Sequence, residues 1–159
     1  MVKSAIYAGA AVVALLGSVA AEARENRPLK CYTGRAHDAP SFGGPALVAN
    51  VPRSMTPIDL NAVQMTDRRL WKSVIVEGLF ARRTETNTLE VTARFVNCTK
   101  EPIVIEARTD FMDAQQVPTE KESAWQRIFL SPLSTKTYQT QSIGTTNVAN
   151  FLVELRSNQ

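Results

Sequence analysis

Residues 74–112 read VIVEGLFARRTETNTLEVTARFVNCTKEPIVIEARTDFM, and this stretch decides the fold. It contains three apolar runs that are separated by two short polar segments. The middle run places its apolar side chains at every second position: Leu89, Val91, Ala93 and Phe95. Alternation with a period of two is typical of a strand with one buried face and one solvated face. The stretch therefore predicts three consecutive antiparallel strands.

The rest of the chain continues the same pattern. A weak strand signal at 58–63 and a single helical turn at 66–72 come before the three runs. After them, turns rich in Pro, Ser and Asn separate three more expected strands: 125–130, 135–142 and 150–156. The strand at 135–142 is polar, so we expect it at a sheet edge. Together these elements predict an all-β fold, an immunoglobulin-like antiparallel β-sandwich of six to seven strands over residues 57–157.

Composition fits one ordinary globular domain. The chain has 159 residues, of which 44% are hydrophobic and 21% charged. This length can bury one core but hardly two. The net charge of +3 is too small to indicate nucleic-acid binding, so no nucleic-acid partner is expected.

The first residues resemble an export signal. Lys3 precedes an apolar run from Ile6 to Leu16, and small residues at Ala20 and Ala23 offer two cleavage points. This pattern predicts that residues 1–23 are a secretory signal peptide. The alternative is an uncleaved membrane anchor, although the apolar run is shorter than the ~20 residues that a spanning helix needs. No transmembrane segment is expected after cleavage.

Two cysteines remain in the exported chain, Cys31 and Cys98. An even number of cysteines in an oxidising compartment predicts a disulfide between them. Two free thiols or a metal site are the alternatives, but a metal needs more ligands than these cysteines and the single histidine, His37, can supply. No metal or cofactor is expected. The bond would fasten an irregular N-terminal segment, 24–56, across the sandwich as a coil strap.

Catalytic candidates are few. His37 could act as a general base, but no recognisable nucleophile motif accompanies it, and a surface position is the simpler interpretation. Paired carboxylates could serve a glycosidase, yet these fall in loops and at a strand end: Asp110, Asp113, Glu120 and Glu122. We therefore expect no catalytic residues and no enzyme activity.

One basic cluster and two tryptophans are candidates for binding. The hairpin could bring two groups of cations together as a contact for an anionic surface: Arg68, Arg69 and Lys72 with Arg82 and Arg83. A solvated face is the alternative. Trp71 and Trp125 could be exposed carbohydrate platforms, but we expect both to fill the core.

The order of motifs resembles the YcfL-like family of bacterial envelope proteins. The similarity covers Pro57 to Arg156 and rests on these segments: Asp67-Arg68-Arg69-Leu70, Val74 to Ala81, Arg82-Arg83-Thr84, Leu89 to Asn97, Phe111-Met112-Asp113 and Ser123-Ala124-Trp125. The sequence departs from the family at Ala114-Gln115-Gln116, where a glycine is usual, and it lacks a lipobox before Cys31. The resemblance implies a periplasmic β-sandwich and brings no catalytic residues.

These observations lead to a functional hypothesis. We expect a non-enzymatic accessory or structural protein of the periplasm that binds another envelope protein or a larger assembly. Association with the outer membrane is compatible with this hypothesis. A glycan- or peptidoglycan-binding module is the alternative, and a small hydrolase is a third possibility. A polar edge strand at 135–142 could pair with a strand of the partner.

Overall fold

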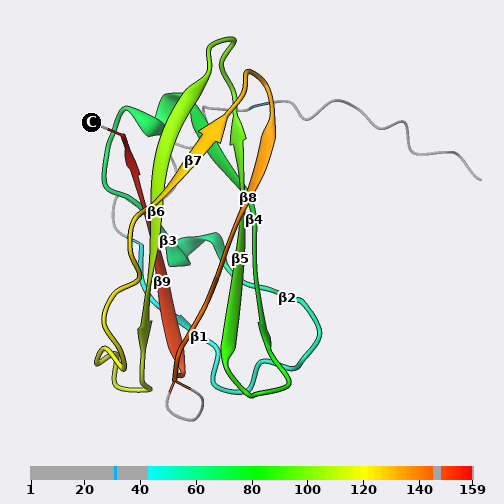
Figure 1. The fold of residues 1–159 in the computed structure, drawn as a ribbon, viewed down its shortest axis with the longest axis vertical. Coiled ribbons are helices and arrows are strands. Elements are labelled where there is room, and N and C mark those ends of the chain that lie inside the picture. Colours follow the sequence, from blue (N-terminus) through cyan, green and yellow to red (C-terminus); the bar gives the residue numbers. More distant parts are fainter. Residues whose placement is uncertain (1–30, 32–42, 145–147, 159) are drawn as a thin grey trace, which may run out of the picture. The chain divides into compact units, whose positions relative to one another are not determined.

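The computed structural model of the protein describes residues 31, 43–144 and 148–158 (Figure 1). These residues form two β-sheets with a shared hydrophobic core between them, which confirms the predicted all-β sandwich. The predicted signal peptide, residues 1–23, and His37 lie outside the described residues.

Each sheet is built around long central strands. Sheet A has the order β1-β9-β6-β7, and β3 also pairs with β9. Its strands are β1 (Ala46–Leu47), β3 (Val63–Met65), β6 (Ile103–Met112), β7 (Gln126–Leu130) and β9 (Asn150–Ser157). Sheet B has the order β2-β4-β5-β8. Its strands are β2 (Thr56–Pro57), β4 (Val74–Arg83), β5 (Leu89–Asn97) and β8 (Thr135–Gln141).

The strands longer than three residues are the six that the sequence predicts most strongly: β4 to β9. The short strands β1, β2 and β3 add two or three residues each at the sheet edges. β3 pairs parallel to β9, an exception in a sandwich that is otherwise antiparallel. The weak strand signal at 58–63 corresponds to the 3-10 helix η2 (Leu60–Ala62) followed by β3.

A β-bulge divides β4 into two parts. The register of β4 against β5 shifts between Val76 and Gly78. Val74 faces the core before the shift, whereas Leu79 and Ala81, at positions of the opposite parity, face it afterwards. One extra residue in a bulge reverses which positions point inward. The period of two therefore holds on each side of the bulge but not across it.

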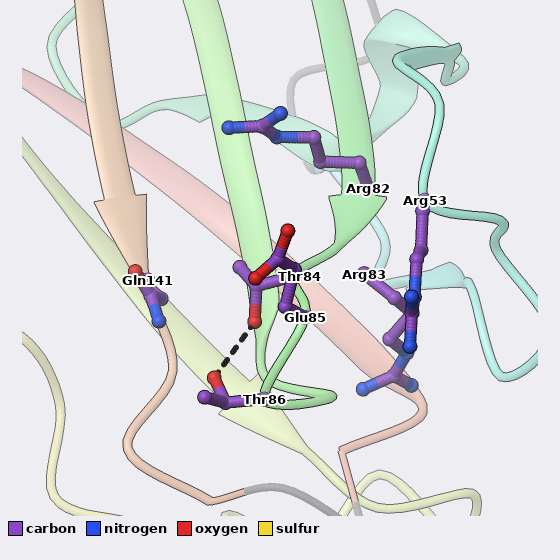
Figure 2. Close-up of a pocket in the computed structure, with 7 residues that line it drawn as sticks. All are labelled: Arg53, Arg82, Arg83, Thr84, Glu85, Thr86 and Gln141. Atoms are coloured by element: carbon purple, nitrogen blue, oxygen red, sulfur yellow. Dashed lines mark hydrogen bonds between the residues drawn. The ribbon is translucent and has the colours of Figure 1, made fainter.

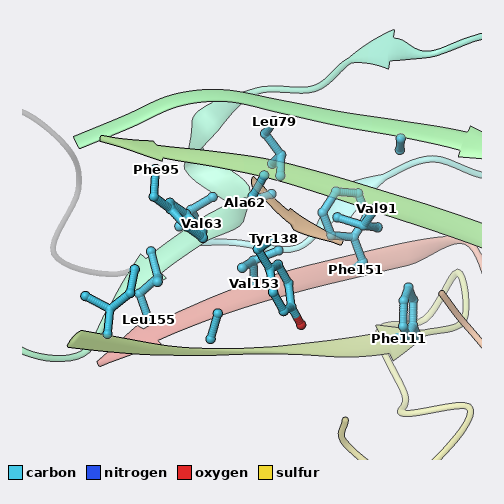
Figure 3. Close-up of a cluster of buried hydrophobic side chains, with 14 of the residues drawn as sticks. Ala62, Val63, Leu79, Val91, Phe95, Phe111, Tyr138, Phe151, Val153 and Leu155 are labelled. Carbon is cyan, nitrogen blue, oxygen red and sulfur yellow. The ribbon is translucent and has the colours of Figure 1, made fainter. Parts of the chain in front are cut away.

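The core lies between β5 and β8 on one side and β6 and β9 on the other (Figure 3). The inward side chains of β5 are all completely buried: Leu89, Val91, Ala93 and Phe95. Tyr138 of β8 packs beside Phe95, with ring centroids 6.4 Å apart, and Phe151 of β9 is completely buried as well. These residues confirm the inward faces predicted for β5 and β9.

The two ends of the sandwich have different connections. At one end, the β4–β5 hairpin turns through Asn87, whose φ of 63° is a left-handed conformation that Asn tolerates better than most residues. At the other end, the completely buried Asn97 donates its side-chain amide to the carbonyls of Glu101, Leu130 and Ser131. Asn97 therefore fastens the β5–β6 turn to the β7–β8 turn.

The described part of the irregular N-terminal segment contacts both sheets. It contributes β1 to sheet A and leads into β2 of sheet B. The helical turn expected at 66–72 is the 3-10 helix η3 (Leu70–Lys72), in which Leu70 is buried as predicted. Cys31 and Cys98 form the predicted disulfide, with their Cα atoms 5.5 Å apart.

Candidate functional site

The five basic residues of the predicted cluster lie at opposite ends of β4. Arg68, Arg69 and Lys72 come just before the strand, in and beside η3, while Arg82 and Arg83 are its last two residues. A strand of ten residues spans about 30 Å. The expectation that the hairpin brings the two groups together is therefore wrong, because the hairpin turn lies at the Arg83 end only.

The group beside η3 is partly neutralised. Arg69 forms an ion pair with Asp67 at 2.9 Å. The hydrogen bond from Arg69, helped by one from Ser157, lowers the pKa of Asp67 to about 2. Arg68 and Lys72 are exposed, and the guanidinium of Arg68 lies 5.8 Å from the centre of the Trp71 ring. At this end Arg68 and Lys72 are therefore exposed cations beside the paired Arg69.

Arg82 and Arg83 point to opposite faces of sheet B. Arg82 lies on the outer face and donates to both oxygens of Glu90, at 2.5 and 3.1 Å. Arg83 points inward, is only 9% exposed and donates to the backbone carbonyls of Ala49, Asn87 and Val148. Within the described residues it has no carboxylate partner, and burial lowers the pKa of its guanidinium.

A polar hollow of about 470 Å³ opens at this end of sheet B (Figure 2). Its lining contains three arginines, three hairpin residues and the last residue of β8: Arg53, Arg82, Arg83, Thr84, Glu85, Thr86 and Gln141. The hydroxyl of Thr84 lies 3.0 Å from that of Thr86 and 2.6 Å from that of Thr88. Arg53 is not one of the basic residues predicted from the sequence, and it reaches the hollow because β2 pairs with the end of β4.

Trp125 lies on the outer face of sheet A, so the expectation that it fills the core is wrong. The residue is half-buried and precedes β7. Its ring packs against two guanidiniums, that of Arg108 at 4.7 Å and that of Arg156 at 4.1 Å. Arg108 is in turn paired with Glu122 and Glu154. Trp71 is also only half-buried and does not belong to the core cluster.

The scattered carboxylates mostly have structural partners. Glu120 accepts hydrogen bonds from the backbone N–H groups of Ile143 and Gly144, and Asp113 accepts from those of Gln115 and Val117. Asp110 differs, because its buried Oδ1 has no hydrogen-bond partner among the described residues. Burial raises its pKa.

β8 forms an open edge of sheet B. It pairs with β5 on one side, and no described strand pairs with its other side, which confirms the edge position predicted for 135–142. The backbone N–H of Asn97 donates to the carbonyl of Ser134, and the backbone N–H of Ser142 donates to the carbonyl of Leu89. These two bonds identify the directly hydrogen-bonded residue pairs at the two ends of the β5–β8 ladder. Directly bonded pairs recur at every second residue, so the backbone groups of Thr137 and Gln139 point away from β5.

The described residues contain neither a cluster of metal ligands nor a membrane-spanning helix. No group of three or more His, Cys, Asp or Glu side chains in the described part of the chain is arranged to hold a metal ion. Over the same residues, none of the helices has the length and apolar character needed to cross a membrane.

Comparison with known proteins identifies the fold and no more. No family model and no curated protein matches the sequence. The crystal structure of Campylobacter jejuni cj0090 is similar with a TM-score of 0.51 and 14% identity, over 61% of this chain and 98% of that one. A DUF1425 family member from Shewanella sp. pv-4 gives a TM-score of 0.48 and 14% identity, over 73% of this chain and 98% of that one. At this identity the likeness to the Campylobacter jejuni protein shows a shared β fold.

Proposed function

We propose that this protein is a non-enzymatic accessory protein of the bacterial periplasm, and that it binds another envelope protein by accepting a strand at the outer edge of β8. The observation that carries the proposal is the open edge itself. β8 has seven residues, TKTYQTQ, and its single charged residue is Lys136.

An open strand edge is a surface that folded proteins usually protect. Charged side chains, prolines, bulges or covering segments normally prevent a foreign strand from pairing there. β8 contains no proline and pairs with β5 without a register shift. Its outward N–H and C=O groups could form a regular ladder with an extended segment of a partner, the mode of recognition called β-augmentation.

The other edges are less suitable. β1 and β3 cover the outer side of β9, and β2 covers part of β4. The backbone N–H of Ile58 also donates to the carbonyl of Leu79, which extends the cover over β4. No described strand pairs with the outer side of β7 either, but β7 has only five residues. β8 therefore offers the longer free ladder.

The cellular location and the family are also part of the proposal. The signal-like pattern in residues 1–23 and the Cys31–Cys98 disulfide both fit an exported protein in an oxidising compartment. The order of motifs that resembles the YcfL-like family supports placing this chain in that family. The shared fold with the Campylobacter jejuni protein is compatible with this assignment.

Photo-crosslinking in intact cells tests the partner proposal. A photoreactive amino acid at Gln139 should give one dominant adduct with another envelope protein, since this exposed residue lies on the free edge. The same group at Arg127, an exposed residue on β7 of the other sheet, is the matched control. Monomer alone from Gln139, or equal adducts from both positions, would refute the use of the β8 edge.

Binding of glycan or peptidoglycan is the second candidate. The observation that favours it is the surface position of Trp71 and Trp125, because aromatic rings outside a core can contact sugar faces. Retention of the protein on purified cell-wall sacculi tests it. Loss of retention in Trp125→Ala, but not in Phe129→Ala, where the exposed apolar residue lies on neighbouring β7, would favour this candidate.

A further inference from the structure

The hollow at the β4–β5 hairpin end contains cationic groups without anionic partners. Arg53 and Arg83 both line it, and within the described residues neither forms an ion pair with a carboxylate. Figure 2 shows the two side chains on the same side of the hollow. Two guanidiniums that share a site repel each other unless an anion or solvent intervenes.

The donors available in the hollow are numerous. Three carbonyls occupy some of the N–H groups of Arg83, and its Nε–H has no hydrogen-bond partner among the described residues. Arg53 is exposed, with its donors unused among the described residues. The hydrogen bond between the hydroxyls of Thr84 and Thr86 uses one of their two hydrogens, so this pair can supply at most one further donor. An oxyanion with several lone pairs could accept bonds from this set.

The charge in the hollow favours an anion. Three arginines line it, against one lining carboxylate, Glu85, and one more carboxylate, Glu90, which is paired with Arg82. The balance is three positive groups to two negative groups. Arginine is the side chain best suited to carboxylate and phosphate oxygens, because its planar fork can donate two parallel hydrogen bonds.

The hollow borders the end of the open edge. Gln141 is the last residue of β8 and also lines the hollow, and it lies opposite Glu90 in the ladder. A partner strand paired along β8 would therefore end, or begin, beside the hollow. We propose that the hollow binds a carboxylate of the partner, carried by an acidic residue or a chain terminus at that end of its added strand. This inference rests on the proposed function and specifies the chemistry of the partner.

Titration with small oxyanions tests the site without any partner. The probes are sodium acetate and sodium phosphate, added to the ¹⁵N-labelled exported chain at constant ionic strength. We expect saturable shifts in the backbone amides of Thr84 to Thr88, and an apparent affinity about fivefold weaker in Arg53→Ala. Lys100→Ala, which removes an exposed cation from the turn at the other end of the sandwich, should leave the affinity unchanged. Shifts that do not saturate, or equal losses in both variants, would overturn the site.

A second experiment separates this inference from the proposed function. With the protein that crosslinks to Gln139, Arg53→Glu should weaken binding about tenfold, and added salt should reduce that difference. If Thr137→Pro abolishes binding while Arg53→Glu does not change it, the carboxylate inference fails and edge pairing stands. If Thr137→Pro has no effect, the proposed function fails. Retention on cell-wall sacculi that depends on Arg53 would assign the anion to peptidoglycan and overturn the partner-strand assignment.

Discussion

The hydroxyl of Tyr138 lies 3.0 Å from Oγ1 of Thr109, inside the core. Tyr138 belongs to β8 of sheet B and Thr109 to β6 of sheet A, and both are almost completely buried. This hydrogen bond joins the two sheets at the strand whose outer edge is open. It holds β8 in place from the core side, so the free edge does not depend on a partner for its position.

Replacing Tyr138 with Phe should lower the free energy of unfolding by about 1–2 kcal/mol, because the Thr109 hydroxyl would remain buried without its partner. The packing against Phe95 should persist, since the ring is kept. Chemical denaturation monitored by tryptophan fluorescence or circular dichroism measures the change. The double variant Tyr138→Phe plus Thr109→Val should recover part of the loss. An additive loss in the double variant would show that the hydrogen bond is not the source.

Reduction of the Cys31–Cys98 disulfide should destabilise the domain. The two cysteines are 67 residues apart. In the chain-entropy description, closing a loop of that length stabilises a fold by about 4 kcal/mol. Denaturant midpoints measured with and without dithiothreitol, and for Cys31→Ser plus Cys98→Ser, give the difference. Equal midpoints under oxidising and reducing conditions would mean that the bond adds no stability.

Asp110 makes stability depend on pH in an unusual direction for a carboxylate. Burial raises its pKa, the negative charge of Glu154 raises it further, and Arg108 opposes both. A raised pKa means that the folded state holds the proton more tightly than the unfolded state does. The ionised form therefore destabilises the fold, and this loss appears as the pH rises above the ordinary value of 3.8.

Asp110→Asn should accordingly increase the free energy of unfolding at pH 7 and change it less at pH 3. Denaturant titrations at the two pH values test this. Glu101→Gln, an exposed residue in the β5–β6 turn, is a control that should have little effect at either pH. An Asp110→Asn variant that is less stable than the wild type at pH 7 would contradict the assignment.

Local alternation was sufficient to predict β5 and β9, since every inward position of β5 follows one unbroken period of two. The bulge in β4 could not be predicted in this way, because its position depends on the pairing with β5. The bulge determines which of Arg82 and Arg83 points inward. Arg83 shares the parity of Leu79 and Ala81 and points inward with them. Their adjacency in the sequence suggested one basic surface, although neighbouring residues on a strand face opposite sides.

The candidate site could be predicted only in part. The polar character of β8 identified the edge strand correctly. Trp125 does not fill the core, because it precedes β7, an edge strand that contributes little to the core. Its ring packs instead across the outer face of β6. Arg53 carries no local signal. Its place in the hollow depends on two contacts of the neighbouring chain. One is the pairing of β2, which is two residues long and contains Pro57, and the other is the hydrogen bond from the backbone N–H of Arg83 to the carbonyl of Pro52.

The central claim is that the outer edge of β8 pairs with a strand of another protein. Proline lacks a backbone N–H and is tolerated at edge strands where that group would face outward. Thr137→Pro removes an outward N–H and keeps the ladder to β5, whereas Lys136→Pro removes an N–H opposite Phe95 within that ladder. The first variant should remain folded, and the second should be clearly less stable.

The most direct measurement is the affinity of folded Thr137→Pro for the protein that crosslinks to Gln139, compared with the wild type. We predict that binding is lost while the unfolding midpoint stays close to that of the wild type. Unchanged affinity in a variant that is demonstrably folded would contradict strand pairing at β8.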